Sequence, residues 1–265
     1  MKFSLLLAAG LPLTSVAGAE EKSGHASAEL LCGVSSYQPG ETVPVAIRLK
    51  IEPGWHSYWI NPGIGGMPLK ATWTLPDGWK AGELQQPVPK RFMTGDLPGF
   101  GYEGEAVFLV DLTPSGDAAG EASLQVKLAW LTCNENSCVP GNVELSLKLP
   151  AGDGAANGNA PVIETAAAKI PKSVEHTRAG VTEEDGVVTM RFHMPGDYDF
   201  KGSQVFPATP DVMDPAAPIT VKWEGERWSV SALKSEYADG AAEALDLVFA
   251  GGNLKHPVVV CWRGK

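Results

Sequence analysis

Two alternating stretches on either side of a pair of cysteines constrain the fold of this chain more than any other feature. Apolar side chains recur at every second position over 124–149, and Cys133 and Cys138 lie in the middle of this segment. If the stretches pair antiparallel with Cys133 opposite Cys138, the apolar residues share one face and Lys127 lies opposite Glu144. A shift of one residue would turn an apolar face outward. The pattern therefore predicts a hairpin with a single register.

This register brings the two cysteines within bonding distance. Directly opposed strand residues have Cα atoms about 4.5–5.5 Å apart, which suits a disulfide. The alternation places both sulfurs on the face away from the core, where a partner thiolate could attack. Two other interpretations stay open. The disulfide could be a structural staple, worth roughly 2 kcal/mol for so short a loop. The spacing also fits zinc, but no second close pair of Cys or His residues completes a four-ligand site.

Further alternating segments predict an all-β protein of two sandwich domains. In the first half 43–51 and 106–112 alternate in the same way, and clusters of Gly, Pro and Asp break the strands. The Gly-rich, polar segment 151–161 is typical of a linker, which gives domains over 29–150 and 162–265. The second domain is expected to open with a helix over 163–169 that ends near Pro171. Its predicted strands cover 188–192, 219–223, 228–232, 245–249 and 258–262.

The N-terminus and the charge indicate an exported protein. Residues 1–19 combine an early lysine, an apolar stretch of about 12 residues and an Ala-Gly-Ala end, which is typical of a cleaved signal peptide. That stretch is too short to cross a bilayer, which needs roughly 20 apolar residues, and no later segment is long enough. The formal net charge of −10 argues against nucleic acid and anionic membranes as partners. We therefore expect a periplasmic or otherwise exported protein without a membrane span.

The remaining cysteines, Cys32 and Cys261, lie near the two ends of the mature chain. In an oxidising compartment they could form a structural disulfide that joins the two domains. Cys261 has the opposite parity to Val258 and Val260, so its side chain should point away from that strand's apolar side. The alternative is two separate thiols, at least one of them buried as a small apolar residue.

Several ordered motifs resemble the N-terminal periplasmic domain of the DsbD and ScsB family of thiol:disulfide interchange proteins. The matching residues form the runs Trp130-Leu131-Thr132-Cys133, Cys138-Val139-Pro140-Gly141, Pro53-Gly54-Trp55-His56-Ser57-Tyr58-Trp59-Ile60-Asn61-Pro62-Gly63, Trp73-Thr74-Leu75-Pro76-Asp77-Gly78-Trp79, Pro87-Val88-Pro89-Lys90-Arg91-Phe92 and Gly101-Tyr102-Glu103-Gly104-Glu105. They run in order from about residue 30 to 150, and the resemblance beyond 162 is looser.

This resemblance implies an immunoglobulin-like sandwich whose working residues are Cys133 and Cys138. Family members pass reducing equivalents from a membrane-embedded module to exported thioredoxin-fold oxidoreductases or isomerases. Their disulfide is shielded by an aromatic residue of a cap loop, and Phe100 or Tyr102 matches that position here. Tyr58 and His56 match positions near the cysteine pair.

Two departures from the family shape the expected function. The pair is spaced Cys-x4-Cys, whereas other members have three or five intervening residues. The sequence also contains no membrane module and no thioredoxin-like domain, so a separate membrane protein would have to supply electrons. We therefore expect an exported thiol:disulfide oxidoreductase or electron relay that uses no metal or other cofactor. The alternative is a non-catalytic immunoglobulin-like binding module whose disulfide is structural.

Overall fold

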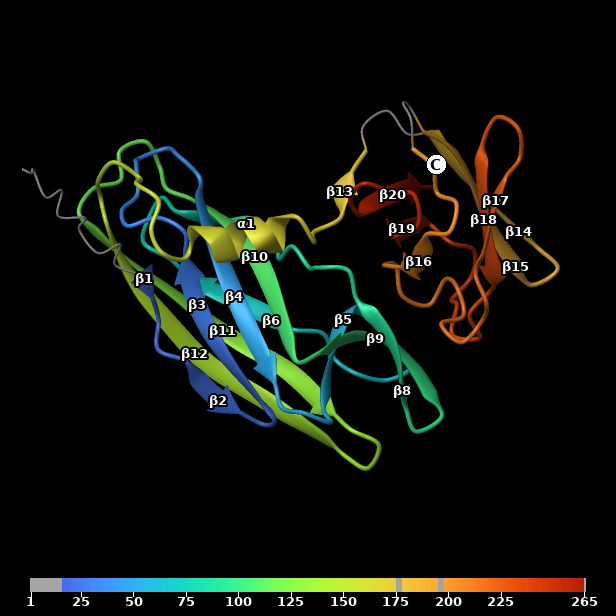
Figure 1. Ribbon diagram of the computed structural model, residues 1–265, viewed down its shortest axis with the longest axis horizontal. Coiled ribbons are helices and arrows are strands. Elements are labelled where there is room, and N and C mark those ends of the chain that lie inside the picture. The colour runs from blue at the N-terminus through green and yellow to red at the C-terminus, as the bar shows by residue number, and fades with distance from the viewer. Residues whose placement is uncertain (1–15, 175–177, 195–197, 265) are drawn as a thin grey trace, which may run out of the picture.

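The computed structural model describes residues 16–174, 178–194 and 198–264, and these form two β-sandwiches (Figure 1). Most of the predicted signal peptide, residues 1–15, and the terminal Lys265 lie outside the described part. The first sandwich contains twelve strands: β1 Val16–Ala17, β2 Glu21–Ser23, β3 Ala26–Cys32, β4 Val43–Ile51, β5 His56–Gly63, β6 Lys70–Thr74, β7 Lys80–Ala81, β8 Lys90–Thr94, β9 Leu97–Glu103, β10 Glu105–Thr113, β11 Glu121–Cys133 and β12 Cys138–Pro150.

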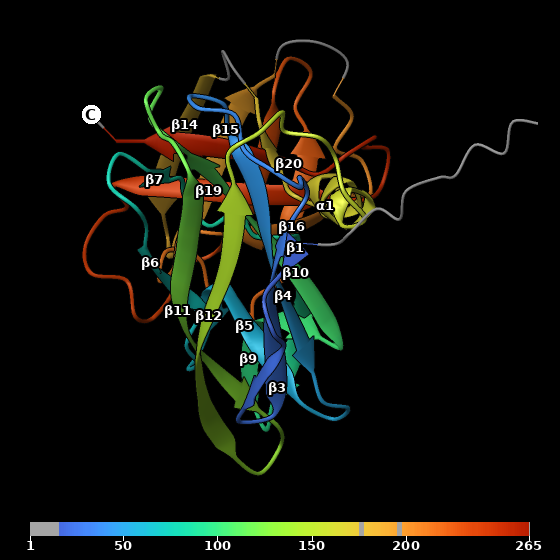
Figure 2. The ribbon, with the colours of Figure 1, turned by 90° about the vertical axis from the view of Figure 1, so that its left-hand side faces the viewer.

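The strands of the first sandwich form two facing sheets. One sheet has the order β1-β3-β4-β10-β7, with β2 paired to β3, and the other has the order β12-β11-β5-β9-β8, with β6 paired to β11. The alternating residues predicted to be apolar on β4, β10, β11 and β12 fill the space between these sheets. The fold is therefore the predicted immunoglobulin-like sandwich, and the long hairpin β11–β12 runs along its length (Figure 2).

The hairpin has the register that the sequence predicts. Cys133 pairs with Cys138, and the apolar pairs continue through Leu128 and Val143. On the outer face, Lys127 Nζ lies 2.8 Å from a carboxylate oxygen of Glu144. Pro140 causes no break because β12 is an edge strand, where a missing N–H donor is tolerated.

Packing requires a glycine at position 141, the last residue of the Cys-Val-Pro-Gly run. It pairs with Trp130, whose indole is fully buried and lies across it. A Cβ atom at Gly141 would come within 2.5 Å of two atoms of this ring. The hairpin therefore needs a residue without a side chain opposite the tryptophan.

A short helix, α1 Ala160–Ala167, follows the first sandwich and packs on its outer surface. The helix begins three residues before the predicted start because Pro161 occupies its first turn, where the fixed φ of proline is favourable. Ile163 and Ala166 cover Leu31, Ala46 and Leu109 on the outside of the first sheet.

The Gly-rich segment 151–161 packs against the first sandwich. Ala151 bridges to Tyr37, and Ala156 bridges to Val34. The Asn157 amide donates hydrogen bonds to the carbonyls of Cys32 and Val34, at 3.0 and 2.8 Å. The segment expected to be a linker is thus bonded to one sandwich, and the connection to the second sandwich follows α1.

The second sandwich is smaller and consists of two four-stranded sheets. Their orders are β13-β20-β19-β16 and β14-β15-β18-β17. All five strands predicted from alternation are present, and the structure adds three that the sequence did not reveal. The eight strands are β13 Lys172–Ser173, β14 Arg178–Glu184, β15 Val187–His193, β16 Gln204–Pro207, β17 Thr220–Trp223, β18 Trp228–Leu233, β19 Ala244–Ala250 and β20 Val258–Arg263.

The two sandwiches share part of their apolar interior. Phe206 on β16 is 1% exposed, and its ring packs edge-on against the rings of Trp59 and Phe100 from the first sandwich. Asn61 on β5 is also buried, and its amide donates a 2.9 Å hydrogen bond to the carbonyl of Pro207. We call the group formed by Trp59, Phe100 and Phe206 the aromatic junction.

Candidate functional site

Cys133 and Cys138 form a disulfide across the last rung of the β11–β12 hairpin, with their Cα atoms 4.1 Å apart. The following turn is closed without help from the sulfurs. The Asn134 N–H donates to the carbonyl of Ser137, and the Asn134 side-chain oxygen accepts from the backbone N–H groups of Asn136 and Ser137, each at 2.9 Å. The turn beside the disulfide is therefore held closed by its own hydrogen bonds.

The two cysteines differ strongly in exposure. Cys138 lies on the edge strand β12 and is exposed, whereas Cys133 on β11 is completely buried. The prediction that both sulfurs can be reached is therefore wrong for Cys133. Its side chain alternates away from the core, but β5 pairs with the end of β11 and brings His56 beside it on the same face.

Three side chains surround His56 on that face, namely Phe92, Thr94 and Tyr58. The Phe92 ring packs on the His56 ring with centroids 3.9 Å apart, and the Thr94 hydroxyl lies 2.9 Å from His56 Nε2. The Tyr58 hydroxyl lies 3.4 Å from the same nitrogen. His56 is only 6% exposed as a result. We call Phe92, Thr94 and His56 the cover, since His56 is the strand neighbour of the buried Cys133.

The predicted cap residues Phe100 and Tyr102 do not belong to this cover, so that prediction is wrong. Tyr102 pairs with Ser57, which is buried in the core, whereas His56 pairs with Glu103. Phe100 and Tyr102 therefore point to the core face of the sheet, opposite to the sulfurs. The alternation of Gly99, Phe100, Gly101 and Tyr102 sends both aromatic rings inward.

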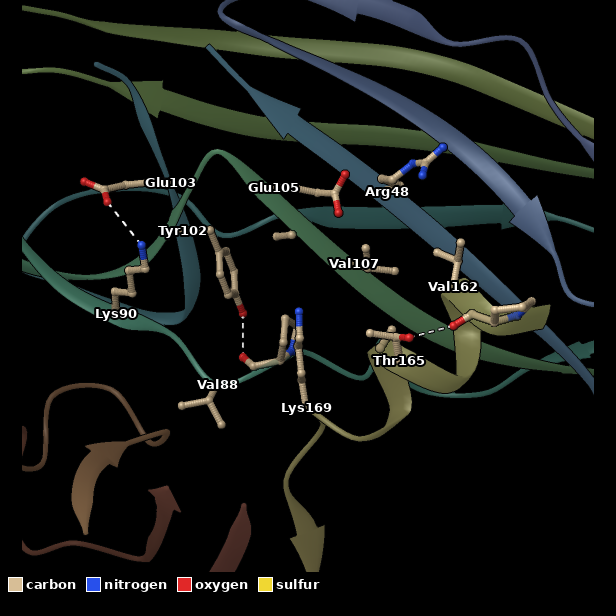
Figure 3. Close-up of a pocket in the computed structure, with 14 residues that line it drawn as sticks. Arg48, Val88, Lys90, Tyr102, Glu103, Glu105, Val107, Val162, Thr165 and Lys169 are labelled. Carbon is tan, nitrogen blue, oxygen red and sulfur yellow. Dashed lines mark hydrogen bonds and ion pairs between the residues drawn. The ribbon is translucent and has the colours of Figure 1, made fainter. Parts of the chain in front are cut away.

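Tyr102 instead forms part of the wall of a cavity of about 520 Å³ that lies between α1, β10 and the segment 87–90 (Figure 3). Its hydroxyl donates a 2.9 Å hydrogen bond to the carbonyl of Pro87. Burial raises the pKa of this hydroxyl well above its ordinary value. Its role here is structural.

His56 pairs with Cys133 at the end of β11, and Tyr58 lies two residues further along β5. Burial lowers the pKa of His56, and the carboxylate of Glu103 opposes this shift. Burial likewise raises the pKa of Tyr58, against a smaller effect of Thr94. Both side chains are thus held in their neutral forms on the face that carries Cys133.

The His56 environment predicts a pH dependence of stability. Because the folded state lowers the pKa of His56, the unfolded chain binds the proton more readily, at a pKa of about 6.5. The free energy of unfolding should therefore fall as pH drops below about 6.5, by at most about 1.4 kcal/mol per pH unit for one proton, until the folded-state pKa is passed. Urea unfolding between pH 7.5 and 5 should show this slope for the oxidised protein, and His56→Gln should reduce it. A titration of the His56 ring protons by NMR with a midpoint at or above 6.5 would contradict the prediction.

Cys32 and Cys261 are free thiols in the structure, so the predicted bridge between the domains is not formed. Cys32 is completely buried inside the first sandwich, where it pairs with Val45, and its thiol cannot reach the second sandwich. Cys261 points outward, as its parity predicted, and pairs with Asp246. Burial raises the pKa of Cys32 to about 11, and partial burial of the sulfur together with the neighbouring Asp246 carboxylate raises the pKa of Cys261 to about 11, which disfavours the reactive thiolate in both.

The structure offers no clear place for a metal within its described ranges. Among residues 16–174, 178–194 and 198–264, no three His, Cys, Asp or Glu side chains gather in a way that could hold an ion. The same ranges contain no helix with the length and hydrophobicity needed to cross a bilayer.

Comparison with known proteins places the first sandwich in a family. Residues 29–150 match the family model described as thiol:disulfide interchange protein DsbD, N-terminal. These residues form a DsbD N-terminal domain. The match covers the β3–β12 region of this DsbD-type domain, including the cysteine pair and the cover. No curated protein sequence matches the chain significantly.

The second sandwich is also found in a solved structure. The N-terminal periplasmic domain of ScsB from Proteus mirabilis is similar over 95% of this chain and 100% of that chain, with a TM-score of 0.67 and 19% identity. At this identity the likeness shows the fold, namely a DsbD-type domain followed by a second sandwich. The YadV chaperone covers 88% of this chain at 10% identity, but its TM-score of 0.23 is too low to support an argument.

Proposed function

We propose that this chain is an exported thiol:disulfide interchange protein that relays reducing equivalents through Cys133 and Cys138. The observation that carries the proposal is the unequal burial of the pair: Cys138 is exposed on an edge strand, and Cys133 is buried behind it. An attacking thiolate needs access to one sulfur and a leaving group on the other. Cys138 supplies the accessible sulfur, and Cys133 is the leaving group.

The exchange then proceeds in two steps. A thiolate of a reduced partner attacks Cys138 Sγ, which breaks the intramolecular disulfide and releases Cys133 as a thiolate that takes up a proton. The second partner thiol then loses its proton and attacks the partner sulfur of the mixed disulfide, which releases Cys138. The partner becomes a disulfide and this chain a dithiol, so two electrons and two protons have moved. The reverse sequence reduces an oxidised partner.

The family and the sequence together support the choice of partners. By analogy with the family, the DsbD-type domain would receive electrons from a membrane-embedded protein and pass them to exported thioredoxin-fold oxidoreductases or isomerases. Oxidation and reduction of such partners by this route takes place at the sulfurs alone and uses no further cofactor. The predicted signal peptide supports a periplasmic location for the mature protein.

The alternative of a purely structural disulfide has less support. The β11–β12 pairing extends over the whole of both strands, and Asn134 closes the turn by itself. A disulfide that spans so short a loop adds roughly 2 kcal/mol in chain-entropy terms. A hairpin already bonded along its length gains little from such a staple.

Redox titration combined with trapping tests the proposal. The Cys133/Cys138 pair should be reduced at a potential above about −300 mV, the region below which inert structural disulfides lie. In a Cys133→Ser variant the Cys138 thiolate should attack the disulfide of an oxidised exported thioredoxin-fold protein, and the mixed disulfide should accumulate because Cys133, which resolves it in the reverse sequence, is missing. Cys261→Ser in the same background removes the other exposed thiol and should leave this adduct in place. Reduction only below about −300 mV, without any adduct, would establish the structural alternative.

A further inference from the structure

Neighbouring side chains of strand β8 contact different parts of the molecule, because they lie on its two faces. Arg91 and Phe92 are neighbours, so their side chains leave the strand in opposite directions. Phe92 lies on the face of the disulfide and belongs to the cover. Arg91 lies on the other face, beside Phe100 of the aromatic junction.

The Phe92 ring lies directly on the backbone of β9. A Cβ atom at Gly99 or Gly101 would approach ring carbons of Phe92 to 2.7 or 2.9 Å. Because β9 has no side chains at these two positions, the ring can reach across the strand to the His56 ring. The position of the cover thus depends on the position of the β8–β9 hairpin.

Arg91 attaches this hairpin to the second sandwich. Its guanidinium group donates hydrogen bonds to the carbonyls of Val205 and Pro215, at 2.9 and 3.2 Å. It also lies 4.8 Å from the ring centre of Phe100 and 5.6 Å from that of Phe206. One side chain of the first sandwich therefore contacts three residues of the second.

The hairpin depends on these contacts because β8 is an edge strand. Within the described chain its only strand partner is β9. An edge strand with a single neighbour opens more readily than a central one. Contact with the second sandwich supplies the support that a further strand would otherwise give.

We propose that the second sandwich is a positioning element for the disulfide: through Arg91 and Phe206 it holds the β8–β9 hairpin so that Phe92 and Thr94 keep His56 over Cys133. Release of this contact loosens the cover and exposes Cys133. This inference rests on the proposed function for its biological meaning, because it assigns the second sandwich control over access to the exchanging pair. Arg91 is a positioning residue and does not contact the sulfurs.

Alkylation of the buried thiol measures the state of the cover. In a Cys138→Ser background, the reaction of Cys133 with iodoacetamide should accelerate on the order of fivefold when Arg91 is changed to Ala, because local opening becomes easier. Lys90→Ala is the matched control, since Lys90 precedes Arg91 on the same strand and its side chain forms an ion pair with exposed Glu103 of the first sandwich. It should leave the rate unchanged. Phe206→Leu should accelerate the reaction as well, and the double variant should add little to the larger single effect.

A second measurement separates release of the cover from general destabilisation. Val230 is completely buried in the core of the second sandwich, away from the junction. A Val230→Ala variant should lower stability without moving the NMR titration of His56. Arg91→Ala should shift the pKa of His56 upward toward its ordinary value, because the ring loses part of the burial that lowers the pKa.

The outcomes are distinct. Equal Cys133 alkylation rates in Arg91→Ala and Lys90→Ala, with an unchanged His56 titration, would overturn the inference. That result would leave the proposed function intact if the wild-type pair still titrates above about −300 mV and forms the trapped adduct. Conversely, a faster alkylation with an inert wild-type disulfide would preserve the positioning role and reject the relay.

Discussion

Alkylation should distinguish the two cysteines by about a hundredfold. In Cys133→Ser the remaining Cys138 is exposed, whereas in Cys138→Ser the remaining Cys133 is completely buried. A buried thiol reacts only when the structure opens locally, and a factor of about 100 corresponds to an opening free energy of about 2.7 kcal/mol. Mass spectrometry of peptides after timed exposure to iodoacetamide would give both rates, and Cys32, also buried, provides an internal slow standard. Similar rates at Cys133 and Cys138 would contradict the assignment of Cys138 as the attacked sulfur.

The same asymmetry determines which variant retains an adduct. In Cys133→Ser the Cys138 thiolate attacks the disulfide of an oxidised partner, and the mixed disulfide persists because Cys133 is missing and cannot resolve it. We therefore expect abundant adducts from Cys133→Ser and few from Cys138→Ser. Adducts that form mainly at Cys133 would require a cover that opens before the Cys133 thiolate can attack an oxidised partner.

Replacement of Phe206 by Ala should destabilise the protein by about 3–5 kcal/mol, the usual cost of removing a fully buried phenylalanine. Phe206 belongs to the second sandwich, but its ring packs on Trp59 and Phe100 of the first. We therefore expect the loss to appear in both sandwiches, and hydrogen exchange should become faster on β5 and β9 as well as on β16. Urea unfolding followed by fluorescence would give the total change.

Phe192→Ala is the matched control for this prediction. Phe192 is as buried as Phe206, but its ring contacts Phe200 and Phe249, within the second core. Its loss should destabilise β15 and β19 by a similar amount and leave exchange on β5 and β9 nearly unchanged. If Phe206→Ala changes exchange only in the second sandwich, the aromatic junction does not couple the two.

The sequence was most informative where one pattern served several interactions at once. The register of β11–β12 could be predicted because the apolar alternation, the Lys127–Glu144 pair and the two cysteines all require the same alignment. The fold class followed from similar alternation on β4, β10 and the strands of the second sandwich. These are contacts between neighbouring strands, and a period of two reveals them.

The sequence was less informative about contacts that tertiary packing creates. Phe100 and Tyr102 alternate with Gly99 and Gly101, and the resemblance alone could not tell which set faces the sulfurs. The glycines offered a signal, because strand glycines often mark a close approach by another group. Here that group is Phe92, which sequence reasoning did not single out.

Sequence reasoning missed the contacts between the sandwiches for the same reason. Arg91 and Asn61 stand within the family-like motifs, but their partners are backbone carbonyls of the second sandwich, more than a hundred residues away. Backbone carbonyls carry no sequence signature. The burial of Cys133 was missed because it depends on the pairing of β5 with the end of β11. The prediction of a disulfide between Cys32 and Cys261 was wrong because the alternation of side chains describes a single strand. It cannot show that one cysteine lies inside one sandwich and the other on the surface of the second.

The connection between the sandwiches has a consequence for how the aromatic junction can open. The carbonyl of Lys169 accepts a hydrogen bond from Val88 in the first sandwich, and the N–H of Lys172 donates to Pro257 in the second. Only Ile170 and Pro171 lie between these two anchor points, and proline fixes one of the few free backbone angles. If Phe206 leaves the junction, so short a tether keeps it at a high effective concentration beside Trp59 and Phe100. Re-association is then an intramolecular event that does not depend on the concentration of the protein, and exchange of sandwiches between molecules is disfavoured.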